Sequence, residues 1–281
     1  QAPISSSEPA SSSSTPSSSS VSSGTVSETI TGNVKELSIS NSGIQYENMW
    51  VKNTNQNHDI DIGAELAKEP AVKMKKDGTI QILIYHTHTT EAFAGSSRTQ
   101  DNSQNVVAVG EEIKKQLEAA GFGVVHDTTC HDYPSYNGAY DRSGETIQRN
   151  LEKYPDIQVT LDVHRDAMGT QDGIRLKPTA MIQGKKAAQI MIISGCDDDG
   201  TLGFPDWEYN LRLGVRVQKS LSDLYPGLAR PLSFCPRKYN EHMTKGSLLV
   251  EFGTEVNTLE EVKYSGQLFG KALAETLNQL T

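Results

Sequence analysis

Residues 79–86 read TIQILIYH, an apolar run rich in β-branched residues that predicts a buried strand. Strand and helix patterns alternate along the chain that follows it. Further strands are expected over residues 122–126, 157–164 and 247–252. Helices are expected over residues 104–120, 143–154, 206–224 and 258–280. Because helices of this length separate the strands, the order predicts an α/β fold with a mainly parallel sheet flanked by helices.

Turn and capping residues predict where several elements begin and end. Gly184 and its neighbouring lysines predict a turn between two paired strands, at residues 174–183 and 187–194. Asp206 is expected to cap the helix that follows it. Residues 258–261 read TLEE, a capping box in which Thr258 and Glu261 each accept a hydrogen bond from the other's backbone N–H group.

The first thirty residues differ from the rest of the chain. They contain fourteen Ser and three Pro, and the first basic residue is Lys35. Such a stretch has too little apolar surface to offset the entropy of ordering its backbone. We therefore expect residues 1–34 to be a disordered Ser-rich linker and residues 35–281 to be a single domain. Ser-rich tracts with Pro are typical of extracytoplasmic stalks, so we expect the full-length protein to carry a membrane anchor that precedes Gln1.

Composition excludes several classes of protein. The 281 residues carry a formal net charge of -9. This argues against nucleic-acid binding, which depends on Lys and Arg contacting phosphates. No apolar run approaches the roughly 20 residues of a membrane-spanning helix. The three cysteines, Cys130, Cys196 and Cys235, contain no CxxC pair, so a cysteine zinc site is not expected.

Side chains that suit a metal accompany three of the predicted strands. His88 and Glu91 follow the first strand, His164 ends the third, and Glu251 lies in the strand near the C-terminus. The carboxyl ends of parallel strands meet at one edge of a sheet, and ligands bind there. We therefore expect these four side chains to lie close together.

Two His and one Glu are a common ligand set for catalytic zinc, and they leave a coordination position for water. The spacing of His88 and Glu91 allows a strand end and its following turn to offer both side chains to one ion, with His164 as the third ligand. Zinc lowers the pKa of bound water to about 7. A separate carboxylate must then carry the proton to the leaving amine, and Glu251 is the candidate for this base.

His86 is an alternative ligand. It lies two residues before His88, so both side chains would point to the same face of a continuing strand. We prefer His88, because it lies beyond the apolar run and has the right spacing to Glu91. His86 is then expected to support the metal site or to face the substrate.

Three blocks carry a resemblance to a known family: IYHTHTTEAF at 84–93, TLDVHRDA at 160–167 and LLVEFGTEVNTLEEV at 248–262. They are similar to stage II sporulation protein P, a family of cell-wall hydrolases related to zinc N-acetylmuramoyl-L-alanine amidases. The resemblance implies an amidase-like catalytic domain over residues 35–281. By position it places His88 and His164 among the metal ligands and Glu251 at the catalytic glutamate.

The resemblance also implies an activity and its setting. Members cut peptidoglycan at the amide between the muramyl lactyl group and the first L-alanine, with Zn²⁺ as cofactor, and are also described as endopeptidases. They act in engulfment during sporulation, tethered to the membrane outside the cytoplasm at the septum between mother cell and forespore. Stage II sporulation proteins D and M are the partners that the resemblance implies.

One departure from the related amidases leaves other activities open. Those enzymes take a Glu ligand from the start of the helix after the first strand, and here that place is near Asn105, a poor zinc ligand. Glu91 must replace it, which makes the set resemble that of zinc carboxypeptidases. A carboxypeptidase or endopeptidase acting on stem peptides is therefore one alternative, and a catalytically inactive wall-binding module is another.

Overall fold

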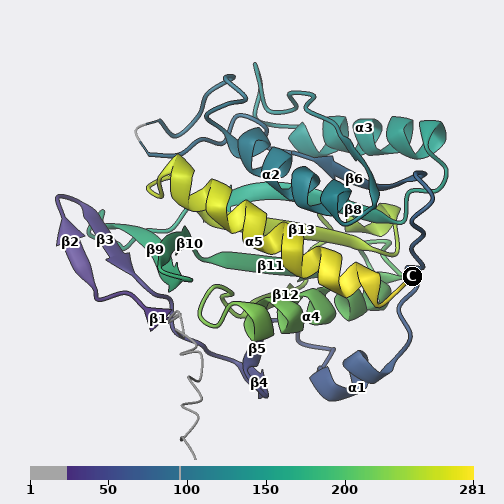
Figure 1. The fold of residues 1–281 in the computed structure, drawn as a ribbon, viewed down its shortest axis with the longest axis horizontal. Helices are drawn as coiled ribbons and strands as arrows, with labels where there is room; N and C mark the ends of the chain where they lie inside the picture. The colour runs from purple at the N-terminus through teal and green to yellow at the C-terminus, as the bar shows by residue number, and fades with distance from the viewer. Residues whose placement is uncertain (1–23, 95) are drawn as a thin grey trace, which may run out of the picture.

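The larger of two β-sheets forms the centre of the molecule (Figure 1). The structure, a computed structural model, describes residues 24–94 and 96–281. The strand order of the larger sheet is β4-β5-β12-β11-β13-β8-β6-β7. Its strands span Ile44–Tyr46 (β4), Met49–Asn53 (β5), Ile80–Tyr85 (β6), Gly123–His126 (β7), Val159–Asp166 (β8), Ile190–Gly195 (β11), Leu232–Cys235 (β12) and Ser247–Thr254 (β13).

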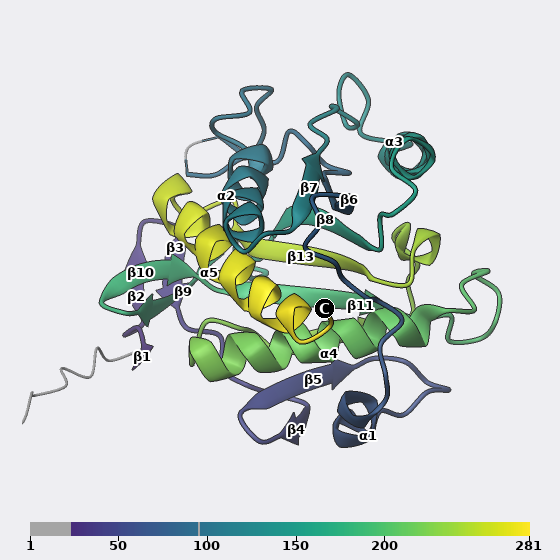
Figure 2. The same cartoon turned by 45° about the vertical axis from the view of Figure 1, so that its right-hand side comes forward.

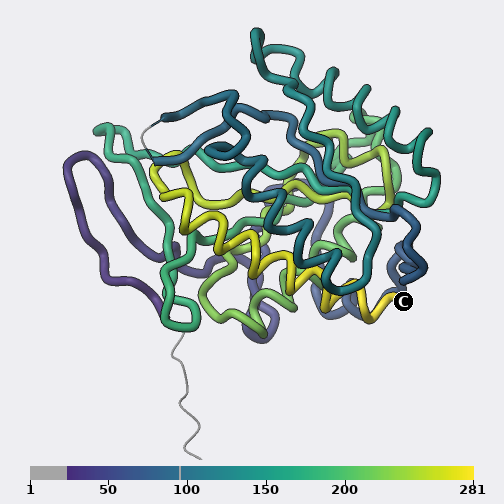
Figure 3. Tube along the Cα trace, turned by 45° about the horizontal axis from the view of Figure 1, so that its top comes forward, coloured from purple at the N-terminus to yellow at the C-terminus, as the bar shows by residue number. Residues whose placement is uncertain are grey.

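A smaller sheet lies at one end of the molecule. Its strands are Gly24–Thr25 (β1), Thr29–Thr31 (β2), Val34–Leu37 (β3), Arg175–Ile182 (β9) and Lys185–Ala188 (β10). Figure 3 shows the purple β2 and β3 segment beside the teal β9–β10 hairpin. The expected turn at Gly184 is confirmed. After β10, however, the chain enters the larger sheet as β11, so the predicted second strand of the hairpin is two strands.

Residues 24–34, which we expected to be part of a disordered linker, contain strands. β1 pairs with β9, and β2 pairs with β3. Every residue of β2 is exposed. Backbone pairing with neighbouring strands therefore orders this segment, although it buries little apolar surface of its own. The rest of the expected linker, residues 1–23, lies outside the described residues.

The α/β class is confirmed, but the sheets are mixed and not mainly parallel. In the described part of the chain, six strand pairings are parallel and five are antiparallel. Three of the antiparallel pairs, β2–β3, β4–β5 and β9–β10, join strands that follow one another directly in the chain. Parallel neighbours need a long crossover connection, and these short connections do not provide one.

Helices cover both faces of the larger sheet. One face carries α2 (Val106–Ala119), α4 (Trp207–Leu224) and α5 (Leu259–Asn278), while the other carries α3 (Ala139–Lys153), seen end-on in Figure 2. Two short helices are α1 (Ile62–Ala67) and the 3₁₀ helix η1 (Glu241–Met243). In β6, Ile82 and Ile84 enter the main core, whereas Leu83 and Tyr85 pack with Ile147 of α3, as the two-residue period of a strand requires. None of the described helices is long and apolar enough to cross a membrane.

The expected capping box at the start of α5 is confirmed. The backbone N–H of Glu261 donates to Thr258 Oγ1 at 3.2 Å, and that of Thr258 donates to Glu261 Oε2 at 3.0 Å. Asp206, by contrast, makes no capping hydrogen bond at the start of α4, contrary to expectation.

Thr258→Ala is expected to lower the free energy of unfolding by about 1 kcal/mol, because an N–H group at the start of α5 loses its acceptor. Thr258→Ser keeps the hydroxyl and serves as the control. Denaturant unfolding of both variants and the wild type measures the effect. An equal loss of stability in the two variants would show that the hydroxyl is not what stabilises α5.

Candidate metal centre

The carboxyl ends of β6, β8 and β13 bring the predicted site residues to one edge of the larger sheet. β6 pairs in parallel with β8, and β8 pairs in parallel with β13. Glu251 lies opposite His164 in the β8–β13 register. His88 and Glu91 lie in the turn that follows β6. Four side chains that are far apart in the sequence are therefore neighbours in the fold.

His88, Glu91 and His164 each offer a ligand atom within 4.8 Å of the other two. His88 Nδ1 lies 3.6 Å from Glu91 Oε1, and His164 Nδ1 lies 3.3 Å from Glu91 Oε2. Burial alone would raise the pKa of Glu91, but its hydrogen bonds to His164 and His88 and the charge of Arg165 hold that pKa well below its usual range. The carboxylate therefore stays ionised at neutral pH, as a metal ligand must.

Asp162 holds His164 and the turn after β6 in place. Asp162 Oδ1 lies 2.8 Å from His164 Nε2 and accepts the backbone N–H of Thr87 at 2.8 Å. Asp162 Oδ2 accepts the Thr87 hydroxyl at 2.6 Å. Burial lowers the pKa of His164, but the neighbouring carboxylates of Asp162 and Glu91 outweigh burial and raise that pKa well above its ordinary value. The surroundings of His164 therefore favour positive charge.

The donor set at this point fits zinc. Two imidazoles and one carboxylate supply the nitrogen and oxygen ligands that catalytic zinc sites use. In the described part of the chain, the buried Oε2 atom of Glu251 has no hydrogen-bond partner. Buried polar atoms are normally paired, so this atom suits a centre whose remaining partner is a water bound to a cation.

Glu251 faces the centre from β13. The residue is partly exposed, although its Oε2 atom is buried. Burial, reinforced by the charges of Glu91 and Asp166 against that of His164, raises the pKa of Glu251 to about 8. A carboxyl group with a pKa near the working pH can both accept and return a proton, which is what a general base needs.

His86 lies away from the centre. β6 ends at Tyr85, so the alternation that would place His86 beside His88 no longer holds. The His86 side chain is fully buried and lies against Gly110 of α2. Its Nδ1 is 2.9 Å from the Val163 carbonyl oxygen, and its Nε2 is 2.9 Å from His126 Nε2. Both ring nitrogens of His86 are thus engaged by the protein, which favours His88 as the ligand.

Three residues near the centre escaped the sequence reasoning: Tyr136, Tyr140 and Asp162. The Tyr136 ring stacks on His88 with centroids 4.5 Å apart, and the edge contact of Tyr140 with His88 is at 5.5 Å. Asp162 had a detectable signal, because it lies two residues before His164 in an apolar strand and shares its face. The tyrosines had none, since they come from a loop and the start of α3.

A second cluster with metal-ligand chemistry consists of His58, Cys196 and Asp198, whose ligand atoms also lie within 4.8 Å of one another. Cys196 follows β11, which runs antiparallel to β13, so this cluster lies at the opposite edge of the sheet. Both Asp198 oxygens already accept backbone N–H groups, from Gln56 and Asn57, each at 2.9 Å. These bonds fasten the loop after β5 to the loop after β11, which gives Asp198 a structural role.

Two solved amidase structures are similar to this chain. N-acetylmuramoyl-L-alanine amidase AmiC2 of Nostoc punctiforme is similar with a TM-score of 0.42 and 11% identity, over 72% of this chain and 94% of the amidase. The CwlD amidase from Clostridioides difficile, solved in complex with the GerS lipoprotein, is similar with a TM-score of 0.43 and 10% identity, over 71% of this chain and 98% of that chain.

Stage II sporulation protein P of Bacillus subtilis (strain 168) is 26% identical over 228 residues, which are 74% of this chain and 53% of the relative. The chain thus spans about half the length of that protein. The family model described as Stage II sporulation protein P (SpoIIP) matches residues 5–274. Because this match covers nearly the whole chain, the protein belongs to the stage II sporulation protein P family.

Proposed function

We propose that the chain is a zinc-dependent peptidoglycan hydrolase, an N-acetylmuramoyl-L-alanine amidase that also acts as an endopeptidase. His88, Glu91 and His164 would hold the zinc, and Glu251 would act as the base. The observation that carries the proposal is the meeting of two imidazoles and one ionised carboxylate beside Glu251. Membership of the family supports a hydrolytic role in sporulation.

Each residue of the centre has a defined task in this proposal. When bound, zinc would polarise the scissile carbonyl and lower the pKa of water. Glu251 accepts the proton of the attacking water and gives it to the leaving amine. Asp162 and Thr87 orient His164 from behind, and such supporting contacts keep metal ligands in position.

Family membership also supports a proposed cellular setting. The full-length protein would act outside the cytoplasm, tethered to the membrane at the septum between mother cell and forespore, and would take part in engulfment. Stage II sporulation proteins D and M would be its partners. A net charge of -9 is compatible with this setting, since the proposed substrate is a wall polymer and not a nucleic acid.

Product analysis tests the activity directly. The protein is loaded with zinc and incubated with purified muropeptides, and the products are identified by mass spectrometry. We expect release of intact stem peptides from the glycan, and loss of this release after treatment with a chelator. Release of single terminal residues would indicate a carboxypeptidase instead. Bound zinc with no product at all would indicate a wall-binding module.

A further inference from the structure

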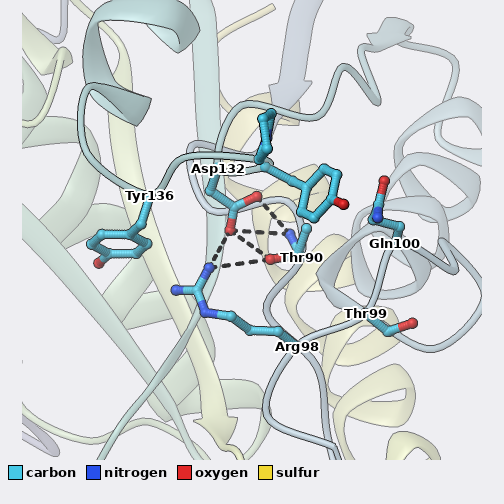
Figure 4. Close-up of a pocket in the computed structure, with 8 residues that line it drawn as sticks. Thr90, Arg98, Thr99, Gln100, Asp132 and Tyr136 are labelled. Atoms are coloured by element: carbon cyan, nitrogen blue, oxygen red, sulfur yellow. Dashed lines mark hydrogen bonds and ion pairs between the residues drawn. The ribbon is translucent and has the colours of Figure 1, made fainter.

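A cavity of about 500 Å³ adjoins the proposed metal centre. Figure 4 shows Arg98 bonded to Asp132 and Thr90 in this cavity, with Tyr136 to one side of the guanidinium. Thr90 belongs to the same turn as Glu91, and an antiparallel bridge joins the backbones of Glu91 and Arg98. The position of Arg98 is therefore fixed relative to the proposed metal ligands.

Tyr136 lies between Arg98 and the proposed metal ligand His88. Its ring stacks on His88 at 4.5 Å, and the Arg98 guanidinium carbon lies 4.6 Å from the same ring centroid. The distance from the Arg98 guanidinium carbon to the centre of the His88 ring therefore cannot exceed the sum of these two distances. An extended peptide advances about 3.3–3.6 Å per residue, so this separation corresponds to no more than two or three residues of a bound peptide.

Only one nitrogen of the Arg98 guanidinium is hydrogen-bonded within the described chain. Nη1 donates to Asp132 Oδ2 at 2.8 Å and to Thr90 Oγ1 at 3.2 Å. In residues 24–94 and 96–281, Nε and Nη2 have no such partner, and 40% of the Arg98 side chain is exposed. The Asp132 side chain is fully buried and also accepts the N–H and hydroxyl groups of Thr90. Asp132 therefore orients Arg98 and is not itself accessible to a ligand.

The free part of the guanidinium matches one chemical group well. Two N–H donors in a planar fork fit the two oxygens of a carboxylate. The Tyr136 ring lies against the guanidinium, and Tyr133 also lines the cavity, so the fork has apolar surface beside it for the rest of a bound peptide. Asp132 is the one acidic residue among the described residues that line the cavity, so no second carboxylate competes for Arg98.

We infer that this cavity binds a carboxylate of the stem peptide, carried by the second or third residue from the amide that is cut, and that Arg98 selects it. The inference rests on the proposed function, because the centre at His88 defines where the amide lies. It adds a preference within that function: acidic stem peptides are cut in preference to peptides whose carboxylate at that place is amidated.

The test uses pairs of soluble muramyl tetrapeptides that carry either a carboxylate or a carboxamide on the second or the third stem residue. For one of the two positions, the wild type should have a kcat/KM about 10–100-fold higher for the carboxylate form, as expected for a charge-assisted bond. Arg98→Gln should lose this preference, so that its kcat/KM values for the carboxylate and carboxamide forms become similar. Arg175→Gln, at an exposed position of strand β9, is the control and should keep the preference.

Two further measurements make the result decisive. The double variant Arg98→Gln/Asp132→Asn removes both charges, so no buried carboxylate is left unpaired if the single variant folds poorly. Calorimetry with the free acidic stem peptide measures the cavity independently of hydrolysis. Equal cleavage of both forms by the wild type would overturn the inference, as would an equal loss on both forms in the Arg98 variants. If no muramyl peptide is cut, the proposed function fails, and peptide binding that depends on Arg98 still decides the inference.

Discussion

Glu251→Gln is expected to lower kcat on muropeptides by about 10³-fold, within the range that general acid–base catalysis contributes, while zinc remains bound. The amide has nearly the shape of the carboxyl group but cannot accept a proton from water. Glu251 is outside the proposed ligand set, so its replacement should leave the metal content unchanged. Steady-state kinetics and elemental analysis of the same preparation measure the two quantities.

Stability provides an independent reading of the same variant. The pKa of Glu251 is raised in the folded metal-free protein. At a pH above the ordinary pKa of glutamate, this carboxyl group therefore ionises more readily in the unfolded chain, which favours unfolding. This penalty grows as pH rises from about 4.5 towards 8, and Gln does not have it. The metal-free variant should therefore be at least as stable as the wild type at pH 8. Glu260→Gln, at an exposed position of α5, is the control and should change neither activity nor stability.

Hydrolysis by Glu251→Gln within tenfold of the wild-type rate would reject Glu251 as the base. Tyr140 would then be the next ionisable side chain to consider beside His88. Tyr140 contacts His88, but burial raises its pKa above its ordinary value, so its hydroxyl holds its proton and cannot replace a base. The raised pKa of Glu251 therefore supports this residue as the proposed base.

Patterns along single elements were the predictable part of this fold. TIQILIYH became β6, and the capping box at Thr258 begins α5. Such features depend on neighbours within a few residues, which a sequence displays directly. The mixed pairing of the sheets did not follow from these patterns, because the direction of β11 against β13 depends on contacts between segments about sixty residues apart.

In the candidate site too, some residues could be predicted from the sequence and others could not. His88, Glu91, His164 and Glu251 could be proposed because each lies at or near the end of a strand, where a parallel arrangement brings them together. His86 was ambiguous because the sequence does not show at which residue β6 stops pairing. Arg98 and Tyr136 could not be proposed, since they reach the centre from loops whose paths are set by hydrogen bonds such as those of Asp132.

His88→Ala and His86→Ala form a matched pair that tests which histidine binds the zinc. The expected effect is a loss of zinc from only one of the two variants. His88→Ala should lower zinc affinity by more than the roughly 10–100-fold that loss of a supporting contact costs, and hydrolysis should disappear with the metal. His86→Ala should keep its zinc. It should instead lose about 2–5 kcal/mol of unfolding free energy, because a buried ring and its contacts with Val163 and His126 are removed.

Metal content after dialysis and denaturant unfolding of the metal-free proteins separate these outcomes. Both variants make the same chemical change, His to Ala, at positions two residues apart. Zinc lost from His86→Ala but retained by His88→Ala would reverse the assignment. That result would require the turn after β6 to rearrange, since His86 now lies on the α2 face beside Gly110 and His88 lies beside Glu91 and His164. The pair therefore tests the geometry of the turn as well as the identity of the ligand.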